Sequence, residues 1–410
     1  STYDVVVVGG GIVGLASARQ LILRHPALRF AVLEKEKEIA LHQSGHNSGV
    51  IHSGIYYTPG SLKARLCVRG AALIYEYCDQ KGIPYKQCGK LIVAVKQPEI
   101  PRLQALYERG LQNNVPGLRL IGAKDIKEKE PLQGKTSTFL VGASGKDAIL
   151  SSAHTKKKQK KNQSHSDSVK RQMCQDWLFY KLSKLRITCY VPYCGQGEEV
   201  HCKYVLTCAG LFSDRVSQVS GCSAEPRIVP FRGDYLVLKP EKCYLVKGNI
   251  YPVPNPRFPF LGVHFTPRMD GSVWLGPNAI LAFKREGYRL CDFNARDFKE
   301  AVTYSGLHKL VLKNLSYGMG EMYRAFFLNA QLKELQKFIP ELSFNDIARG
   351  PSGVRAQALD RDGNLVDDFV FDGGSGDLAN CILHVRNAPS PAATSSLAIS
   401  EMIASEVEER

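Results

Sequence analysis

The chain begins with an apolar run that breaks at closely spaced glycines. Residues 3–8 read YDVVVV, which predicts a buried β-strand, and GGGIVG follows at 9–14. An apolar, Ala-rich stretch then continues to Leu23, as expected for a helix, and a second apolar run at 30–33 ends at Glu34. This order of strand, glycines, helix, strand and acid is typical of a dinucleotide-binding β-α-β unit.

Each glycine of such a unit, and the acid at the end of its second strand, has its own physical task. We expect Gly9 to make the tight turn, Gly11 to let the backbone approach a pyrophosphate, and Gly14 to let the helix pack closely on the strand. The helix N-terminus offers free N–H groups and the positive end of its dipole to the phosphates. Glu34 is expected to accept hydrogen bonds from the ribose hydroxyls. A dinucleotide site is therefore favoured over a turn that is merely rich in glycine.

Beyond this unit, helical and strand patterns alternate and then change character. The sequence HQSGHNSGVIHSGIYY at 42–57 has neither period and predicts a long functional loop. Helices are predicted at 61–81, 100–113, 297–313, 319–338 and 391–407, and strands at 89–95, 200–207, 228–238, 245–252, 260–266 and 272–277. The strands of the second half predict a mixed or antiparallel sheet.

Composition and charge exclude several classes of protein. The hydrophobic content of 44% is ordinary for a soluble globular protein, and no apolar run reaches the roughly 18 residues that a membrane span requires. Twelve basic and three acidic residues lie between Leu132 and Gly195, so most of the net charge of +15 belongs to this low-complexity stretch. No nucleic-acid-binding module accompanies it, and a solvated, irregular basic segment is the better interpretation. The twelve cysteines form no metal-type spacing, and we expect no metal site.

Several longer motifs extend these observations to most of the chain. They are FRGDY at 231–235, LGVHFTPRMDGSVWLGPNA at 261–279, AFKREGY at 282–288, GVRAQALDRDGNLVDDF at 353–369 and NAPSPAATSS at 387–396. With the glycine motif and the 42–57 loop, they resemble the D-amino-acid-oxidase-type flavoproteins over residues 3–131 and 200–408. Within that family the chain is similar to members that oxidise L-2-hydroxyglutarate to 2-oxoglutarate. Residues 133–195 depart from the family pattern.

The resemblance implies an α/β fold with FAD as the cofactor. It implies an FAD-binding Rossmann-like domain (1–84, 200–227 and 346–410), a substrate domain built on a mixed or antiparallel sheet (85–132 and 228–345), and an atypical basic segment at 133–199 that we expect to be disordered. Besides the glycines and Glu34, the implied FAD-binding residues are Lys35, Ser48, Gly49, Val50, Ala209, Gly210, Gly353, Ser390 and Ala392.

The resemblance also implies where the electrons go and where the protein works. Because there is one dinucleotide motif, we expect the electron acceptor to be a quinone or an electron-transfer protein rather than NAD. A mitochondrial location is implied, with the targeting peptide absent from this chain. Peripheral association with the inner membrane is a further expectation, whereas nucleic acid is not expected as a partner.

Oxidation of a 2-hydroxy acid needs a base for the hydroxyl proton and cations for the carboxylates. His52 and His264 are the candidate bases, with His52 preferred, although either could instead be a buried histidine that donates to a carbonyl. Arg355 is the favoured cationic anchor. Further candidates for substrate contacts are Tyr57, Tyr235, Arg268 and Lys284, although Lys284 could be part of an ordinary charged turn and either tyrosine a packed core ring.

Two other functions stay open at this stage. The chain could be an FAD oxidoreductase of the same fold that acts on another 2-hydroxy acid or amino acid. It could also be a catalytically inactive isoform, because residues 133–195 depart from the family.

Overall fold

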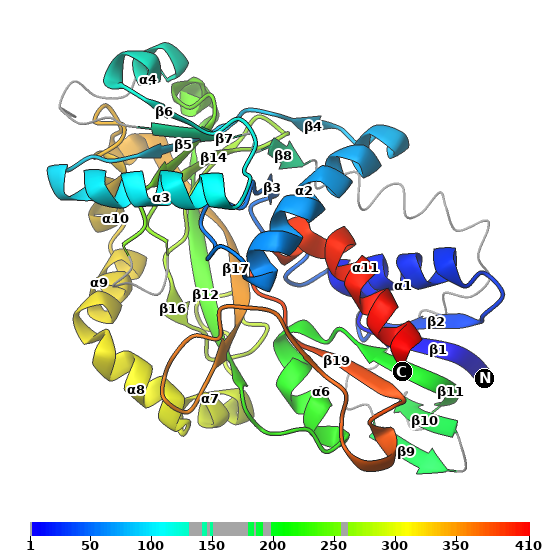
Figure 1. The fold of residues 1–410 in the computed structure, drawn as a ribbon. Coiled ribbons are helices and arrows are strands. Elements are labelled where there is room, and N and C mark those ends of the chain that lie inside the picture. The colour runs from blue at the N-terminus through cyan, green and yellow to red at the C-terminus, as the bar shows by residue number, and fades with distance from the viewer. Residues whose placement is uncertain are drawn as a thin grey trace.

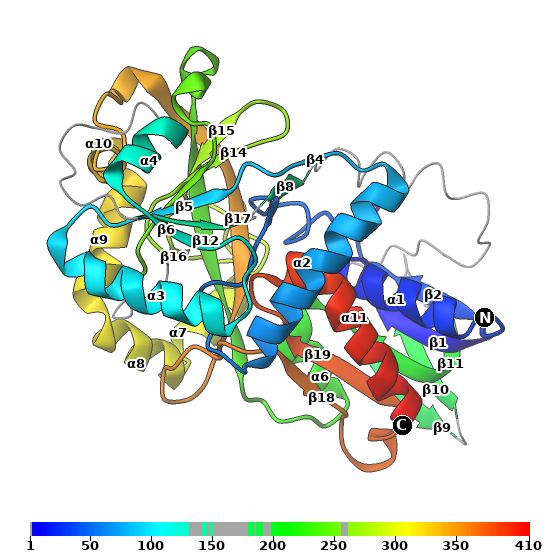
Figure 2. The same cartoon turned by 45° about the horizontal axis from the view of Figure 1, so that its top comes forward.

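The computed structural model describes residues 2–130, 142–145, 148–150, 179–183, 186–191, 198–255 and 261–410. These residues form two large sheets that lie side by side, each with helices packed on it (Figures 1 and 2). A third, small sheet has the order β3-β8-β4. Its strands are β3 (Val50–Ile51), β4 (Tyr85–Lys86) and β8 (Ala148–Leu150).

The first sheet contains the predicted dinucleotide-binding unit. Its central order is β18-β19-β11-β1-β2, and β1 runs parallel to both β11 and β2. Strands β10 and β9 extend the sheet in antiparallel fashion beyond β11. The strands are β1 (Thr2–Val8), β2 (Phe30–Leu33), β9 (Phe179–Ser183), β10 (Arg186–Val191), β11 (Glu198–Thr207), β18 (Val370–Asp372) and β19 (Ile382–Asn387).

Alternation along β1 explains why its apolar run is unbroken. Val5 and Val7 pack with the helices on one face, whereas Val6 packs with Val205 on the other face. A parallel strand that is buried on both sides needs apolar residues at every position. Helices α1 (Ile12–Arg24), α2 (Leu62–Lys81) and α11 (Ala392–Glu409) lie next to one another on this part of the molecule (Figure 1).

The second sheet is built around a long antiparallel pair, β12 (Arg227–Leu238) and β17 (Ile347–Leu359). The remaining order is β16-β12-β15-β14-β13-β5-β7-β6, in which β13 and β5 are parallel. These strands are β5 (Lys90–Val93), β6 (Arg119–Ile121), β7 (Gly142–Gly145), β13 (Asn249–Pro252), β14 (Phe265–Pro267), β15 (Val273–Leu275) and β16 (Ile280–Leu281). Since β17 pairs with β12 throughout, it belongs by hydrogen bonding to this sheet, although the domain boundary predicted at 346 places it in the FAD-binding part.

Helices cover the outer side of the second sheet (Figure 2), and two of the predicted helical stretches are divided. Each of the two helices predicted at 297–313 and 319–338 is divided, because backbone turns at Thr303 and Phe327 interrupt the hydrogen-bond ladder. The helices are α3 (Ile100–Gln112), α4 (Ala123–Lys129), α7 (Ala295–Val302), α8 (Ser305–Lys313), α9 (Leu315–Phe326) and α10 (Leu328–Leu335), and α6 (Ser213–Val219) follows β11.

The basic segment predicted to be disordered over 133–199 falls mostly outside the described residues. Where its backbone is described, the segment forms strands: β7 pairs with β5, β8 with β3, and β10 with β11. Backbone hydrogen bonds to strands from elsewhere in the chain form these pairs, so the segment's own side-chain pattern need not predict them.

Helix α2 contacts α11 through a glycine. A Cβ atom at Gly70 would lie 2.5 Å from the Thr394 carbonyl oxygen and 2.6 Å from Ser395 Cα. Both neighbours are backbone atoms at the start of α11, so neither can rotate away. The separation of these two helices is therefore set by the absence of a side chain at this position.

We predict that Gly70→Ala lowers the free energy of unfolding by about 1–3 kcal/mol, because the added methyl forces α2 and α11 apart. The matched control is Gly318→Ala in α9, where an added Cβ has nothing within 4 Å. Because alanine has a higher helix propensity than glycine, this variant should be more stable than the wild type by about 0.5–1 kcal/mol. Thermal or urea unfolding measures both variants, and equal shifts of the same sign would contradict the close-packing argument.

Candidate functional site

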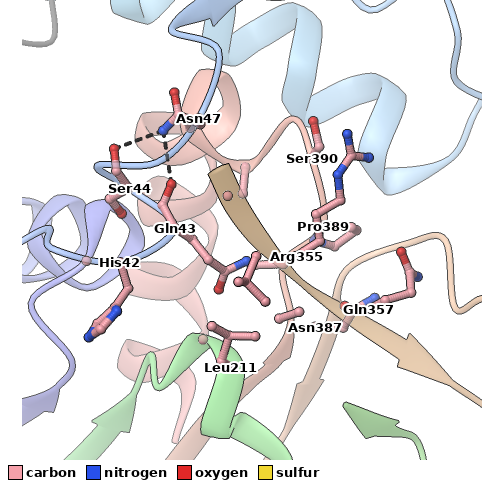
Figure 3. Close-up of a pocket in the computed structure, with 18 of the residues that line it drawn as sticks. His42, Gln43, Ser44, Asn47, Leu211, Arg355, Gln357, Asn387, Pro389 and Ser390 are labelled. Carbon is pink, nitrogen blue, oxygen red and sulfur yellow. Dashed lines mark hydrogen bonds between the residues drawn. The ribbon is translucent and has the colours of Figure 1, made fainter. Parts of the chain in front are cut away.

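A cavity of about 1160 Å³ is lined by residues of both large sheets. Segments far apart in the chain meet around it: the first β-α turn, the 42–57 loop, the turn after β11, strand β17 and the segment that leads into α11. Figure 3 shows His42 to Asn47 on the loop, Arg355 and Gln357 on β17, and Asn387 to Ser390 before α11, on different sides of this space.

One end of the cavity is formed by the glycine turn between β1 and α1. Gly9 has φ +110°, and a Cβ there would lie 2.3 Å from the Cys208 carbonyl oxygen. A Cβ at Gly14 would lie 2.0 Å from the Gly9 carbonyl oxygen, which confirms the close helix–strand packing. Gly11 lines the cavity, and Ser44 Oγ, 2.8 Å away, accepts the N–H of Ile12 at the start of α1. The turn thus presents backbone to the cavity where a pyrophosphate would need it.

Glu34 is held rigidly at the same end. One carboxylate oxygen accepts the Gly10 N–H at 2.8 Å, and the other accepts the Glu36 N–H at 3.0 Å. Two backbone donors fix the plane of the carboxylate at the tip of β2. Because each oxygen keeps further lone pairs, the group can still accept hydrogen bonds from a ligand.

Lys35 connects this end to the opposite wall. Its ammonium lies 2.8 Å from Glu286 Oε2 and 2.5 Å from Glu36 Oε1, and His42 Nε2 lies 2.9 Å from the same Glu36 oxygen. Burial would lower the pKa of Lys35, but the two carboxylates outweigh burial and raise that pKa. Glu36, His42 and Glu286 could together ligate a cation, yet the Lys35 ammonium already supplies the positive charge between them.

Two residues predicted to touch ligands instead support the 42–57 loop. Gly49 has φ +70° and donates its N–H to Asn47 Oδ1 at 2.8 Å. The Arg268 guanidinium donates to the carbonyl oxygens of Asn47 and Ser48 and stacks 4.2 Å from the Trp274 ring centroid. Neither residue lines the cavity. Arg268 is therefore a loop anchor in this structure, because loop carbonyls lie within reach of its donors.

The other end of the cavity contains both histidines that were proposed as bases. His52 Nδ1 lies 3.2 Å from Lys90 Nζ, and its backbone N–H donates to Thr394 Oγ1 at 3.1 Å. His264 is 6% exposed, stacks 4.3 Å from the Tyr251 ring centroid and places Nδ1 3.0 Å from the Gly262 carbonyl oxygen. Burial lowers the pKa of His264 to about 4. Gly276 makes room for this ring, since a Cβ there would lie 2.5 Å from Nδ1.

The proposed substrate-binding residues are distributed along the cavity. Arg355 lines it from β17, and Tyr57 and Tyr235 line it from the loop and from β12. Burial raises the pKa of Tyr235, so its hydroxyl stays protonated and can donate. Lys284 also lines the cavity, but it precedes Glu286, the partner of Lys35, and so lies on the loop that closes the glycine-turn end.

The remaining proposed cofactor contacts line the cavity at places where segments of backbone approach one another closely. Gly210 has φ +53°, and a Cβ at Gly353 would lie 2.5 Å from the His46 carbonyl oxygen. Helix α11 begins at Ala392, directly after Ser390 and Pro391, so its N-terminus faces the cavity. Of all the candidate site residues, those that line the cavity are Gly9, Gly11, Gly14, Glu34, Lys35, Ser48, Val50, His52, Tyr57, Ala209, Gly210, Tyr235, His264, Lys284, Gly353, Arg355, Ser390 and Ala392.

Lys90 is a further residue of this site that the sequence did not predict, although its position carries a signal. Lys90 is 3% exposed and begins β5, between Gly89 and an apolar run. A lysine at a buried strand position needs a specific polar or aromatic environment. A lysine at such a position is therefore a signal of a functional or structural role. The sequence does not show what its partner is, because His52 lies 38 positions away.

Comparison with known proteins agrees with this architecture. A family model described as "FAD dependent oxidoreductase" matches residues 4–152 and 184–406, so 153–183 lies outside the match, a narrower departure than the predicted 133–195. The chain is 64% identical to the mitochondrial L-2-hydroxyglutarate dehydrogenase of Bos taurus over 428 aligned residues, covering 100% of this chain and 89% of that protein. The enzyme of the same name from Nematostella vectensis is 58% identical, covering 100% and 91%.

Solved structures show the same fold at much lower identity. FAD-bound L-α-glycerophosphate oxidase from Mycoplasma pneumoniae superposes with a TM-score of 0.75 at 20% identity, covering 100% of this chain and 95% of that one. L-proline dehydrogenase from P. horikoshii gives 0.70 at 16% identity, covering 100% and 94%. With the family model matching most of its length and a dinucleotide cradle at the end of its large cavity, the chain belongs to the FAD-dependent oxidoreductases.

Proposed function

We propose that this protein oxidises L-2-hydroxyglutarate to 2-oxoglutarate with FAD. The observation that carries the proposal is one continuous cavity that is lined both by a dinucleotide cradle and by two histidines and an arginine. The relatives that are 54–64% identical carry the name L-2-hydroxyglutarate dehydrogenase, which supports this substrate.

The residues at the cradle fit FAD. The glycine turn brings backbone to the cavity at Gly11, and Glu34 is oriented by two backbone N–H groups. The start of α11 at Ala392 adds a helix N-terminus on another wall, where its dipole favours negative charge. Bound FAD would accept the hydride that leaves C2 of the substrate.

The chain's own residues supply the rest of the chemistry. Arg355 offers a planar fork of donors that matches a carboxylate, and a five-carbon diacid carries two carboxylates. The protonated hydroxyl of Tyr235 can donate to the substrate from the cavity wall. The proton of the 2-hydroxyl passes to one of the two histidines that line the same end.

We also propose that the electrons leave to a quinone or an electron-transfer protein at the mitochondrial inner membrane. Across the described part of the chain, no helix has both the length and the apolar character needed to cross a bilayer. Helix α9, however, exposes Leu315, Met319, Met322, Tyr323 and Phe326 on one face, each at least 51% exposed. Leu312 in α8 is 74% exposed, and α8 and α9 follow each other along the outer edge of the second sheet (Figure 1).

This apolar face supports peripheral docking. Large side chains at i, i+4, i+7, i+8 and i+11 form one stripe of a helix, and an apolar stripe that stays more than half exposed resembles an interfacial helix.

The proposed reaction can be tested directly by the visible spectrum of the flavin. The purified chain should be yellow, and its visible flavin absorbance should bleach when L-2-hydroxyglutarate is added without oxygen. D-2-hydroxyglutarate, the mirror-image control, should leave the spectrum unchanged. Yellow protein that another 2-hydroxy or amino acid bleaches, and that L-2-hydroxyglutarate does not, would overturn the proposed substrate.

A second prediction tests the anchoring role of Arg355. Arg355→Lys should raise the KM for L-2-hydroxyglutarate about 10- to 100-fold, because the bidentate fork is lost while the charge remains. The matched control is Arg361→Lys, an arginine on the loop after β17 that is exposed and paired with Glu225. Steady-state kinetics measure both, and an unchanged KM in the Arg355 variant would remove it from substrate binding.

A third prediction tests the apolar face. Replacing Leu312, Met319 and Phe326 together by serine should reduce co-sedimentation with vesicles of anionic lipid, because the apolar contact area is lost. Leu23→Ser is the control, since Leu23 is 60% exposed on α1 in the other part of the molecule. Equal co-sedimentation of all three proteins would argue against docking through α8 and α9.

A further inference from the structure

The two cavity histidines differ in the kind of hydrogen-bond partner that Nδ1 has. Both lie at the same end of the cavity, and both are of the residue type that accepts a hydroxyl proton. A neutral imidazole has one protonated and one unprotonated nitrogen, so a partner at Nδ1 decides what Nε2 can do. The nature of that partner therefore assigns a role to each ring. This inference deepens the proposed function and rests on it.

At His52 the partner of Nδ1 is a donor. Lys90 Nζ lies 3.2 Å from Nδ1, and an ammonium donates hydrogen bonds but accepts none. The ammonium lies 4.5 Å from the Tyr251 ring centroid and 5.4 Å from that of Tyr56, so two aromatic faces stabilise its charge in a buried position. Nδ1 of His52 must accept, and the ring proton then resides on Nε2.

At His264 the partner is an acceptor. The Gly262 carbonyl oxygen, 3.0 Å away, can only accept, so Nδ1 carries the proton and Nε2 keeps its lone pair. Burial and the charges of Arg355 and Lys90 all oppose a second proton on this ring, although the Gly262 carbonyl favours it. His264 is thus neutral at physiological pH, with an unprotonated Nε2.

We propose that Lys90 is a positioning residue that makes His52 a hydrogen-bond donor, and that His264 takes the hydroxyl proton. In the step, the O–H bond of the 2-hydroxyl breaks and its proton moves to His264 Nε2. The electron pair left on oxygen would form the C2=O bond while bound FAD would accept the hydride from C2. His52 keeps its proton and donates Nε2–H to the substrate. This assignment reverses the preference for His52 that the sequence suggested.

The electrostatics of the cavity suit a base of this kind. His264 resists protonation in the empty cavity because cations and apolar surroundings oppose a positive ring. A dianionic substrate brings two negative charges into the same space and offsets Arg355. The proton affinity of His264 therefore rises when substrate binds.

The kinetic test uses one substitution at both positions. Glutamine retains an N–H donor near the Nε2 position but has no basic nitrogen. In anaerobic stopped flow with L-2-hydroxyglutarate, His264→Gln should slow flavin reduction about 10²- to 10⁴-fold, as expected for loss of a general base. His52→Gln should slow reduction less than about 10-fold, since one hydrogen bond to a charged group is largely kept. The opposite order, or equal losses, would overturn the assignment.

The second measurement needs no turnover. In the FAD-loaded protein with ¹⁵N-labelled histidine, the ring nitrogen signals should show the Nε2–H tautomer for His52 and the Nδ1–H tautomer for His264. The two glutamine variants assign the signals. Lys90→Met should abolish the tautomer preference of His52, whereas Lys86→Met, an exposed lysine in β4, should not.

Each result separates the inference from the proposed function. If His52 carries its proton on Nδ1 in the wild-type protein, or keeps Nε2–H in a folded Lys90→Met variant, Lys90 does not set the tautomer and the proposal is wrong. The wild-type spectrum alone decides this if Lys90→Met does not fold. If L-2-hydroxyglutarate fails to bleach the wild-type protein, the proposed substrate fails while the two tautomers stay measurable.

Discussion

The arrangement of the two sheets depends on a buried carboxylate, Asp214, at the start of α6. Its oxygens bind the Arg285 guanidinium, with Nη2 at 2.9 Å from Oδ2, and the same Oδ2 accepts the Ile228 N–H at 3.0 Å. The side chains of Asp214 and Arg285 are 3% and 4% exposed. Arg215, the next residue, binds Asp297 and Glu300 at 2.5 and 2.6 Å. This ion cluster joins the helix after β11 to the first residues of β12 and to the segment at 282–300.

The stability of the fold depends on every member of such a buried ion cluster. Removing one member of a buried pair leaves an uncompensated charge and costs about 3–5 kcal/mol. The cluster also fixes the loop that carries Glu286, whose carboxylate meets Lys35 across the cavity. The cavity wall at the glycine-turn end is therefore held by electrostatics, whereas at the histidine end it is held by packed rings such as Tyr251 against His264.

The features that could be predicted from the sequence are those that depend on neighbouring residues in the chain. The structure places Gly14 against Gly9 and Glu34 at the tip of β2, as expected, because the tight turn and the strand end follow from neighbouring residues. The contacts of Arg268 with the loop could not be expected, because its acceptors belong to residues 47 and 48, more than two hundred positions away. Lys90 escaped notice for the same reason, since only the fold reveals His52 beside it. Strands β7 and β10 form through partners elsewhere in the chain, which their own composition does not indicate.

The cavity draws on opposite ends of the amino-acid sequence. Residues 9–14 form one wall, and residues 387–394, with the helix that follows them, form another. During synthesis the glycine turn emerges early, yet it faces no completed cavity until α11 has left the ribosome and packed on α1 and α2. The complete cavity therefore forms only after translation has passed α11.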